Sequence, residues 1–516
     1  MTSPPLLIRN ARVLSSSPWQ RRSDAVLVEG GLIIALGPEA DLRAAAKASR
    51  AEDLDLRGRT LAPAFLDAHL HLLAYAASLV SLDCRQGVVA SIEDIKERIR
   101  ARVQSLPPGA WVRATGYDEG SLAEGRHPTR RDLDLAAPDN PVRLTHRSGH
   151  ACVLNSRALA LAGIDASTPE PPGGLMERDL DSGEPTGLLL EMNDVVERVV
   201  PPLEKAELKA AVSEASTRLL ASGMTFIQDA THTNGAAEWA LFEELIEDGA
   251  LRQTVSLMEG ADYVGELPER SERLRRGPVK VMPRELEHEF YPSAAELATI
   301  LRRIEAAGRE AAVHAVTHRG LDVVLDAFQT LGRRANGHRI EHCGVCSPAQ
   351  AARIARLGLT VVTQPGFLYS NGDLMLRRLP AGDLSDLYPL RGLLDAGVLV
   401  AGSSDAPVVD PDVIAALRAA LERRSHSGQD MGAAQAVSPT EALAMFTSSA
   451  ALALGVEHER GAIAPGLAGD FVVLNQHLSE DSAAWEGMTV EMTIQAGEVV
   501  YEAARPSGLA SQSQRG

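Results

Sequence analysis

Eight short apolar segments alternate with longer amphipathic stretches through the middle of the chain. Such alternation is typical of β/α units arranged around a parallel sheet. Eight is the number of strands that closes a (β/α)8 TIM barrel, so the sequence predicts an α/β fold of that architecture. The strands are expected at residues 62–70, 223–230, 252–259, 278–282, 311–316, 338–343, 359–364 and 398–405.

Both ends of the chain carry short alternating runs that are typical of antiparallel strands and hairpins. The N-terminal runs are LLIRNARVL and DAVLVEGGLIIALG, and the C-terminal runs are GAIAPGLAGDFVVLNQ and MTVEMTIQAGEVVYEA. We expect residues 1–60 and 460–503 to pair into one composite β-domain, which leaves 61–459 to the barrel. Residues 504–516 are expected to form a disordered tail.

One interval breaks the β/α rhythm, because about 150 residues separate the first barrel strand from the second. Residues 85–205 are therefore expected to form an inserted lid or subdomain. The insertion leaves from the end of a barrel strand, so it is placed to cover the mouth of the barrel.

Charge and cysteine content limit the class of partner. The chain has 51 basic and 69 acidic residues and a formal net charge of −18, which argues against nucleic acid or an anionic membrane and favours a small-molecule partner. The sequence shows no secretory signal and no apolar stretch long enough to cross a bilayer. Four cysteines in a chain of this length fit a reducing compartment, so a cytoplasmic location is expected. The Cys343-x-x-Cys346 pair is interpreted as buried structural residues, because no second pair lies nearby.

Polar side chains interrupt the apolar strands at six positions. Alone, each has an ordinary explanation: a hydrogen-bonded core histidine, a lysine reaching solvent, or an aspartate capping a turn. Side chains at the C-terminal ends of barrel strands converge on one mouth, however, so all six are expected to meet in space and bind a divalent metal. The six are His69, His71, Lys280, His314, His342 and Asp405.

In these six residues and in several longer motifs, the chain resembles the amidohydrolase superfamily, and within it the YtcJ-like branch, amidohydrolase family 3. The resemblance runs through WVRATGYDEGSLAEGRHPTRRDLD, DNPVRLTHRSGHACVLNSRAL, HRIEHC and GSSDAP. It implies a (β/α)8 barrel with a composite β-sandwich from both termini. It also implies that the four histidines and Asp405 are metal ligands, and that Lys280 matches a lysine that relatives carry as an N-carboxylated bridge between two metals.

The expected chemistry follows from this ligand set. Carboxylation would turn Lys280 from a cation into an anionic oxygen ligand. Zinc suits imidazole and carboxylate ligands, with nickel, iron or manganese as alternatives and one or two ions bound. A metal-activated hydroxide would attack an amide-like C–N bond of a small molecule, with Asp405 as general base and acid. The products would be a carboxylic acid and an amine.

Residues that shape the substrate pocket are expected in the lid and in two loops that depart from the family pattern. After Lys280 the chain runs KVMPRELEHEFYPS, where Glu285 and His288 are candidate substrate contacts. After His314 the family's Gly-Asp is replaced by Thr317 and His318, which makes His318 another candidate. In the lid, His146 and His150 are candidate substrate contacts. Asp229, at the end of the second barrel strand, is expected either to orient a ligand imidazole or to cap a helix.

Two other functions stay open at this point. The same metal site serves deaminases and decarboxylases elsewhere in the superfamily, and some relatives have become non-catalytic scaffolds by losing ligands. The complete ligand set argues against a scaffold. A homodimer is the default expectation for an oligomer, because most soluble oligomers are symmetric dimers.

Overall fold

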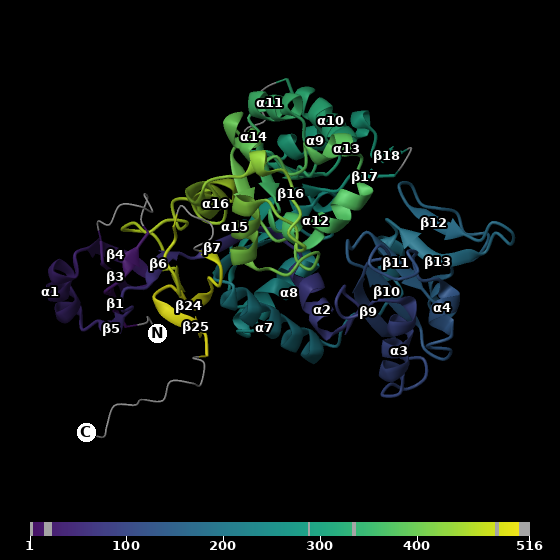
Figure 1. The fold of residues 1–516 in the computed structure, drawn as a ribbon, viewed down its shortest axis with the longest axis horizontal. Helices are drawn as coiled ribbons and strands as arrows, with labels where there is room; N and C mark the ends of the chain where they lie inside the picture. Colours follow the sequence, from purple (N-terminus) through teal and green to yellow (C-terminus); the bar gives the residue numbers. More distant parts are fainter. Residues whose placement is uncertain (1–3, 15–22, 287–288, 333–336, 480–484, 505–516) are drawn as a thin grey trace.

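The computed structural model describes residues 4–14, 23–286, 289–332, 337–479 and 485–504. Three parts lie in a row: a β-domain that contains both ends of the chain, a central barrel, and a lid (Figure 1). Within the described ranges, no helix has the length and apolar character needed to cross a membrane. The predicted tail from residue 505 onward lies outside the described residues.

The barrel sheet contains the eight predicted strands. All neighbours in it pair in parallel, in the order β22-β21-β20-β19-β16-β15-β14-β7. Two hydrogen bonds of 2.8 Å, from Asp405 N to His69 O and from His71 N to Ala406 O, join the segment after β22 to β7 and bring the ring close to closure. The prediction of a (β/α)8 barrel is thus confirmed. The strands are β7 (Phe65–Leu70), β14 (Met224–Asp229), β15 (Thr254–Gly260), β16 (Leu274–Val281), β19 (Ala311–Ala315), β20 (Arg339–His342), β21 (Thr360–Thr363) and β22 (Val400–Gly402).

The expected strand at 62–70 is divided between two sheets. Its first part belongs to β6 (Thr60–Pro63), which pairs with a C-terminal strand of the β-domain, and its second part is barrel strand β7. Between them, Ala64 N donates a hydrogen bond to Asp470 O at 3.0 Å. Both sheets bury this segment, so its apolar run continues through the point where the chain passes from one sheet to the other.

Helices cover the outside of the barrel (Figure 1). Helix α9 illustrates why they form: Ser293 and Glu296 make a capping box at its start, and Leu297, Leu301 and Ile304 recur at helical spacing on its buried face. The barrel helices are α2 (Leu72–Val80), α7 (Lys205–Ala221), α8 (Ala236–Glu247), α9 (Ala294–Ala306), α10 (His318–Gln329), α11 (Pro348–Leu357), α12 (Gly366–Arg378), α13 (Ala381–Leu384), α14 (Leu390–Asp395), α15 (Val413–Glu422), α16 (Pro439–Met445) and α17 (Ser448–Ala453). A small hairpin, β17 (Arg284–Glu285) and β18 (Phe290–Tyr291), follows β16.

The β-domain consists of two sheets that share one core. Ile8 and Val28 from the first sheet pack with Phe471 and Ile494 from the second. The first sheet has the order β4-β3-β1-β5, with β1 (Leu6–Arg9), β3 (Ala25–Glu29), β4 (Leu32–Gly37) and β5 (Glu52–Asp55). The second has the order β2-β6-β23-β24-β25, with β2 (Arg12–Val13), β23 (Phe471–Leu474), β24 (Val490–Gln495) and β25 (Glu498–Glu502).

Two pairings in this domain differ from the antiparallel arrangement that the sequence pattern predicts. Strands β2 and β6 pair in parallel. Strands β1 and β5 are also parallel, because helix α1 (Glu39–Ser49) returns the chain to the starting end of the sheet. Leu42 and Ala46 of this helix pack on Leu7 and Leu27.

The lid is built around a sheet of its own, in the order β12-β13-β11-β10-β9-β8. Ile95, Ile99, Tyr117 and Leu133 lie in its separate hydrophobic core. The strands are β8 (Leu82–Asp83), β9 (Val112–Tyr117), β10 (Val142–His146), β11 (Ala151–Leu154), β12 (Leu175–Arg178) and β13 (Pro185–Leu190), and the helices are α3 (Ile92–Val103), α4 (Arg130–Asp134), α5 (Ser156–Ala162) and α6 (Asn193–Glu197). This sheet carries the lid's candidate substrate contacts: His146 ends β10, and His150 directly precedes β11.

Candidate metal centre

The two histidines of FLDAHLHL meet Asp405 where the barrel ring closes. His69 is fully buried near the end of β7, and His71 follows that strand directly before α2. Asp405 Oδ1 lies 3.6 Å from His69 Nε2 and 3.3 Å from His71 Nε2. One ligand atom from each of the three side chains lies within 4.8 Å of the other two, which is close enough for all three to bind one ion.

The other three predicted ligands extend this group. Lys280 Nζ lies 3.4 Å from His69 Nε2. The ring centroid of His342 lies 4.9 Å from that of His69 and 4.5 Å from that of His314. The structure thus brings together all six predicted residues, from β7, β16, β19, β20 and the segment after β22.

Two of the six have an uncommon backbone conformation. His342 has φ 72° and Asp405 has φ 57°, both in the left-handed region that non-glycine residues rarely occupy. Residues held in this region cluster at functional sites, because the surrounding structure must compensate for the strain. The hydrogen bond from Asp405 N to His69 O is one such compensation.

Burial and neighbouring charges favour the protonation states that metal ligands require. Burial lowers the pKa of His69 and of His314 well below the usual histidine value, and burial also lowers the pKa of Lys280. For Asp405, burial alone would raise the pKa, but the hydrogen bond with His71 and the neighbouring histidine side chains hold it well below its usual range. Burial therefore favours neutral imidazoles at His69 and His314, and the hydrogen bond favours an ionised carboxylate at Asp405.

His314 supplies a direct test of whether a cation fits. Its Nδ1 atom is buried and has no hydrogen-bond partner among the described residues. A buried polar atom without a partner is costly, and coordination of a cation would remove that cost. Together with a donor set of four imidazoles and a carboxylate, this atom makes the cluster fit a divalent metal.

Residues that sequence reasoning did not single out hold the ligand rings. Glu341 Oε2 accepts a hydrogen bond from His69 Nδ1, and Arg339 Nε donates to Glu341 Oε1 at 2.6 Å. His342 Nδ1 lies 2.9 Å from Gln364 Oε1, and His71 Nδ1 lies 3.1 Å from Thr231 Oγ1. Such outer partners set the tautomer and the orientation of ligand histidines. The sequence showed only that Glu341 precedes His342 in the predicted barrel strand HRIEHC.

We expect Glu341→Gln to weaken metal binding about 10–100-fold, because the substitution removes the negative charge that supports His69. The dissociation constant is measured by competition with a chelator. Glu305→Gln is the matched control, since Glu305 lies 3.5 Å from His338 in another histidine–carboxylate pair. An unchanged dissociation constant in Glu341→Gln would remove Glu341 from this role.

Asp229 contacts the backbone beside a ligand. It accepts hydrogen bonds from Leu72 N at 2.7 Å, from Thr231 N at 3.0 Å and from Asn234 Nδ2 at 2.9 Å. Of the two roles expected for it, these contacts match helix capping, although the helix is α2 and not the one that follows Asp229 in sequence. Because α2 begins directly after His71, Asp229 stabilises the turn that carries this histidine.

The two lid histidines lie in different surroundings. The ring centroid of His150 lies 5.7 Å from that of His314, so His150 stands beside the metal cluster. Its Nδ1 atom lies 2.8 Å from Glu191 Oε1. Burial alone would lower the pKa of His150, but the hydrogen bond to Glu191 outweighs it and the pKa is raised. His146 instead contacts Glu119 at 3.0 Å, within a second group of polar side chains.

That second group consists of Asp118, Glu119 and His146, whose ligand atoms are also close enough for one ion. Two arginines argue against a cation here. Arg378 Nη1 lies 2.6 Å from Glu119, and Arg147 Nη1 lies 3.6 Å from Asp118. Because Arg378 belongs to barrel helix α12, the group anchors the lid to the barrel.

The candidate substrate contacts in the two loops that differ from the family pattern have partners within these loops or on the outer helices. Thr317 Oγ1 donates to Glu285 Oε2 at 2.6 Å. His318 Nδ1 lies 2.8 Å from Gln350 Oε1, and its Nε2 lies 3.3 Å from Asp386. A substrate contact for Glu285 or His318 stays a prediction, and His288 lies outside the described residues.

The two cysteines of the C-x-x-C segment do not contribute to the metal cluster. Cys343 and Cys346 are buried, and their mutual hydrogen bond, together with burial, raises the pKa of Cys343 well above the usual thiol value.

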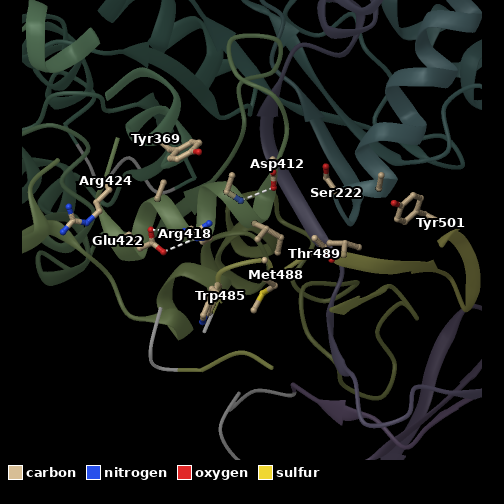
Figure 2. A pocket seen from close by; sticks show the side chains of 16 residues that line it. Ser222, Tyr369, Asp412, Arg418, Glu422, Arg424, Trp485, Met488, Thr489 and Tyr501 are labelled. Atoms are coloured by element: carbon tan, nitrogen blue, oxygen red, sulfur yellow. Dashed lines mark hydrogen bonds and ion pairs between the residues drawn. The ribbon is translucent and has the colours of Figure 1, made fainter. Parts of the chain in front are cut away.

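A cavity of about 520 Å³ lies between α15 and the segment that leads into β24 (Figure 2). Its lining includes Trp485, Met488 and the Arg418–Glu422 pair. None of the six predicted ligands lines this cavity.

Comparison with known proteins places the chain among hydrolases. The sequence profile of the Amidohydrolase family matches residues 52–501. An N-substituted formamide deformylase from Arthrobacter pascens is 33% identical, and the alignment covers 91% of this chain and 93% of that protein. The YtcJ protein of Bacillus subtilis (strain 168), named as an amidohydrolase, is 27% identical over 93% of this chain and 96% of its own length.

Solved structures show the same fold. A metal-dependent hydrolase from Pyrococcus horikoshii OT3 superposes with a TM-score of 0.73 at 22% identity, covering 92% of this chain and 99% of that one. A metal-dependent hydrolase from Pyrococcus furiosus superposes with a TM-score of 0.71 at 24% identity, covering 93% and 99%. The barrel with its β-domain is therefore a known arrangement.

Proposed function

Because the chain belongs to the amidohydrolase family and is a metal-dependent hydrolase of carbon–nitrogen bonds other than peptide bonds, we propose that its substrate is a small N-acylated amine. Within this class, N-formylated amines are proposed as the principal substrates. The observation that carries the proposal is the convergence of four imidazoles, Lys280 and Asp405 at one end of the barrel. The formyl preference is supported by the 33% identity to a formamide deformylase along nearly the whole chain.

Six side chains would hold the metal: His69, His71, Lys280, His314, His342 and Asp405. A bound divalent ion supplies a Lewis acid for the carbonyl oxygen and lowers the pKa of water from about 15.7 toward 7. The four imidazoles favour zinc over magnesium or calcium, which prefer oxygen ligands.

Lys280 is proposed to be N-carboxylated. Its amine would attack carbon dioxide, form an N–C bond and release a proton, which leaves an anionic carbamate. The reaction needs a neutral amine, and burial favours that form by lowering the pKa of Lys280. The side chain is 2% exposed and lies 3.4 Å from His69 Nε2, so the carbamate oxygens would face the other ligands.

Asp405 is proposed to carry the proton. Its ionised carboxylate would accept a proton from the attacking water and deliver it to the amide nitrogen as the C–N bond breaks. The hydroxyl group of that water stays on the acyl carbon, so the products are a carboxylic acid and an amine. His71 Nε2 at 3.3 Å and His342 Nδ1 at 3.8 Å flank the two carboxylate oxygens and hold them at the centre of the cluster.

A panel of substrates tests this function. The panel contains N-alkyl and N-aryl formamides, the matching acetamides, aminated heterocycles and carboxylated compounds. We expect release of formate and amine in equal amounts from at least one formamide. Release of ammonia from an aminated heterocycle, or of carbon dioxide from a carboxylated compound, with every amide untouched would contradict the proposal.

A further inference from the structure

Tyr388, in the segment between α13 and α14, stands at the mouth of the barrel. Its hydrophobic neighbours include Val345 after β20, Phe367 after β21 and Val409 after β22. The ring centroids of Tyr388 and Phe367 are 6.0 Å apart. These neighbours belong to segments that leave the C-terminal ends of three barrel strands, and the metal cluster lies at the same ends. The tyrosine ring is therefore part of the wall that surrounds the cluster.

The hydroxyl group of Tyr388 lies against the backbone that follows His342. A β-carbon added at Gly344 would lie 3.5 Å from the hydroxyl oxygen. Burial raises the pKa of Tyr388, and the charge of Asp405 raises it further, so the hydroxyl is within electrostatic reach of Asp405. Tyr388 is only 3% exposed, yet its hydroxyl has no hydrogen-bond partner among the described residues. Buried tyrosine hydroxyls usually have one, so this group is left for a ligand.

A buried arginine holds the turn that carries Tyr388. Arg423 is 1% exposed and donates from Nη1 to Tyr388 O and from Nη2 to Leu387 O, each at 2.8 Å. Tyr388 N in turn donates to Gly344 O at 2.7 Å. These bonds keep Tyr388 at φ 42°, in the left-handed region, where a bulky residue is an outlier. A strained residue fixed in this way beside a candidate active centre indicates that its side chain has a required direction.

The acyl oxygen is the atom of an amide that fits this hydroxyl. The oxygen accepts hydrogen bonds, whereas the amide N–H donates them. The nitrogen is assigned to Asp405, which delivers the proton to it, so the oxygen is left for Tyr388. This oxygen gains negative charge as water adds to the acyl carbon, and a donor already in position stabilises that charge most in the transition state.

We propose that the hydroxyl of Tyr388 donates a hydrogen bond to the acyl oxygen of the amide substrate and stabilises the charge that develops there. The inference rests on the proposed function and adds a catalytic residue to it. No bond to Tyr388 forms or breaks, and its proton stays on the phenol oxygen. Arg423 is a positioning residue, because it acts only through the turn that carries Tyr388.

Tyr388→Phe removes the hydroxyl and keeps the ring. We expect kcat for an N-alkylformamide to fall about 10–100-fold with little change in KM, because the lost bond matters most in the transition state. Metal content and melting temperature should stay as in the wild type. Tyr369→Phe is the matched control, since the Tyr369 hydroxyl lies 3.0 Å from His426 Nδ1 on α12 of the same barrel. It should retain wild-type turnover.

A change in the substrate identifies the atom that Tyr388 contacts. The matching thioformamide replaces the acyl oxygen with sulfur, which is a weak hydrogen-bond acceptor. We expect the ratio of the formamide rate to the thioformamide rate to be at least about tenfold larger in the wild type than in Tyr388→Phe. Equal ratios in the two enzymes would overturn the contact with the acyl oxygen.

Binding of an N-alkyl phosphonamidate gives a readout independent of turnover, because its tetrahedral, anionic centre resembles the adduct of water with the amide. Calorimetry should show a dissociation constant about 10–100-fold higher in Tyr388→Phe. Should this variant fail to fold, a crystal structure of the wild-type complex tests the same contact, with about 3 Å expected between the Tyr388 hydroxyl and an oxygen of the ligand.

The outcomes separate the two proposals. Unchanged kcat and unchanged phosphonamidate binding in Tyr388→Phe would overturn the role of Tyr388, as would a ligand oxygen out of hydrogen-bond reach in the crystal. A wild type that hydrolyses no amide would overturn the proposed function instead.

Discussion

Asp405→Asn is expected to lower kcat at least about a hundredfold while the metal stays bound, because an amide oxygen can still act as a ligand but the side chain cannot accept the proton of the attacking water. The substitution is nearly isosteric. Asparagine tolerates the left-handed backbone better than most residues, so φ 57° at this position adds little strain. The measurement is single-turnover hydrolysis of a formamide together with metal analysis of the same preparation.

Asp410→Asn is the matched control for this experiment. Asp410 lies five residues further on, is 69% exposed, and pairs with Arg85 at 2.8 Å. It should retain wild-type turnover. Retained turnover in Asp405→Asn would exclude Asp405 as the proton carrier, and loss of the metal would show that Asp405 acts chiefly as a ligand.

Removal of the metal should abolish hydrolysis and lower the stability of the fold. Without a cation, the buried Nδ1 of His314 has no partner among the described residues, and the carboxylate of Asp405 stays buried beside His69, His71 and His342. A ligand present at a thousand times its dissociation constant stabilises the native state by about 4 kcal/mol. We therefore expect chelation to lower the melting temperature and to reduce turnover to background.

Added zinc should restore both turnover and melting temperature in the chelated protein. Magnesium is the control ion, because it prefers six oxygen ligands and an imidazole-rich site does not supply them. Full activity after complete chelation would contradict metal dependence. Equal recovery with magnesium would contradict the proposed preference for zinc.

The barrel and its ligand cluster were largely predictable from the sequence. Parallel strands buried on both faces form continuous apolar runs, so each histidine or lysine inside such a run is conspicuous. His69 lies in β7 and His71 directly follows that strand, and barrel geometry collects the ends of distant strands at one mouth. These two regularities brought Lys280, His314 and Asp405 into the prediction, although they are far from His69 in the chain.

What escaped prediction depends on contacts between elements. The role of Glu341 depends on the side chain of His69, 272 positions away, and nothing local distinguishes it from an ordinary buried carboxylate. The contact between Glu191 and His150 likewise depends on the pairing of β13 with β11. The sequence did not reveal that the chain passes from the β-domain sheet to the barrel sheet at Ala64, because one apolar run continues through both buried strands. The lid sheet was missed because its strands are short and turn-rich segments, such as residues 179–184 between β12 and β13, separate them.

The most direct measurement of the central claim is X-ray diffraction from crystals of zinc-loaded protein at wavelengths on either side of the zinc absorption edge. The account predicts anomalous density among His69, His71, His314, His342 and Asp405, with ligand distances of about 2.0–2.2 Å. Anomalous density elsewhere in the chain, or an active crystal with none at this cluster, would contradict it.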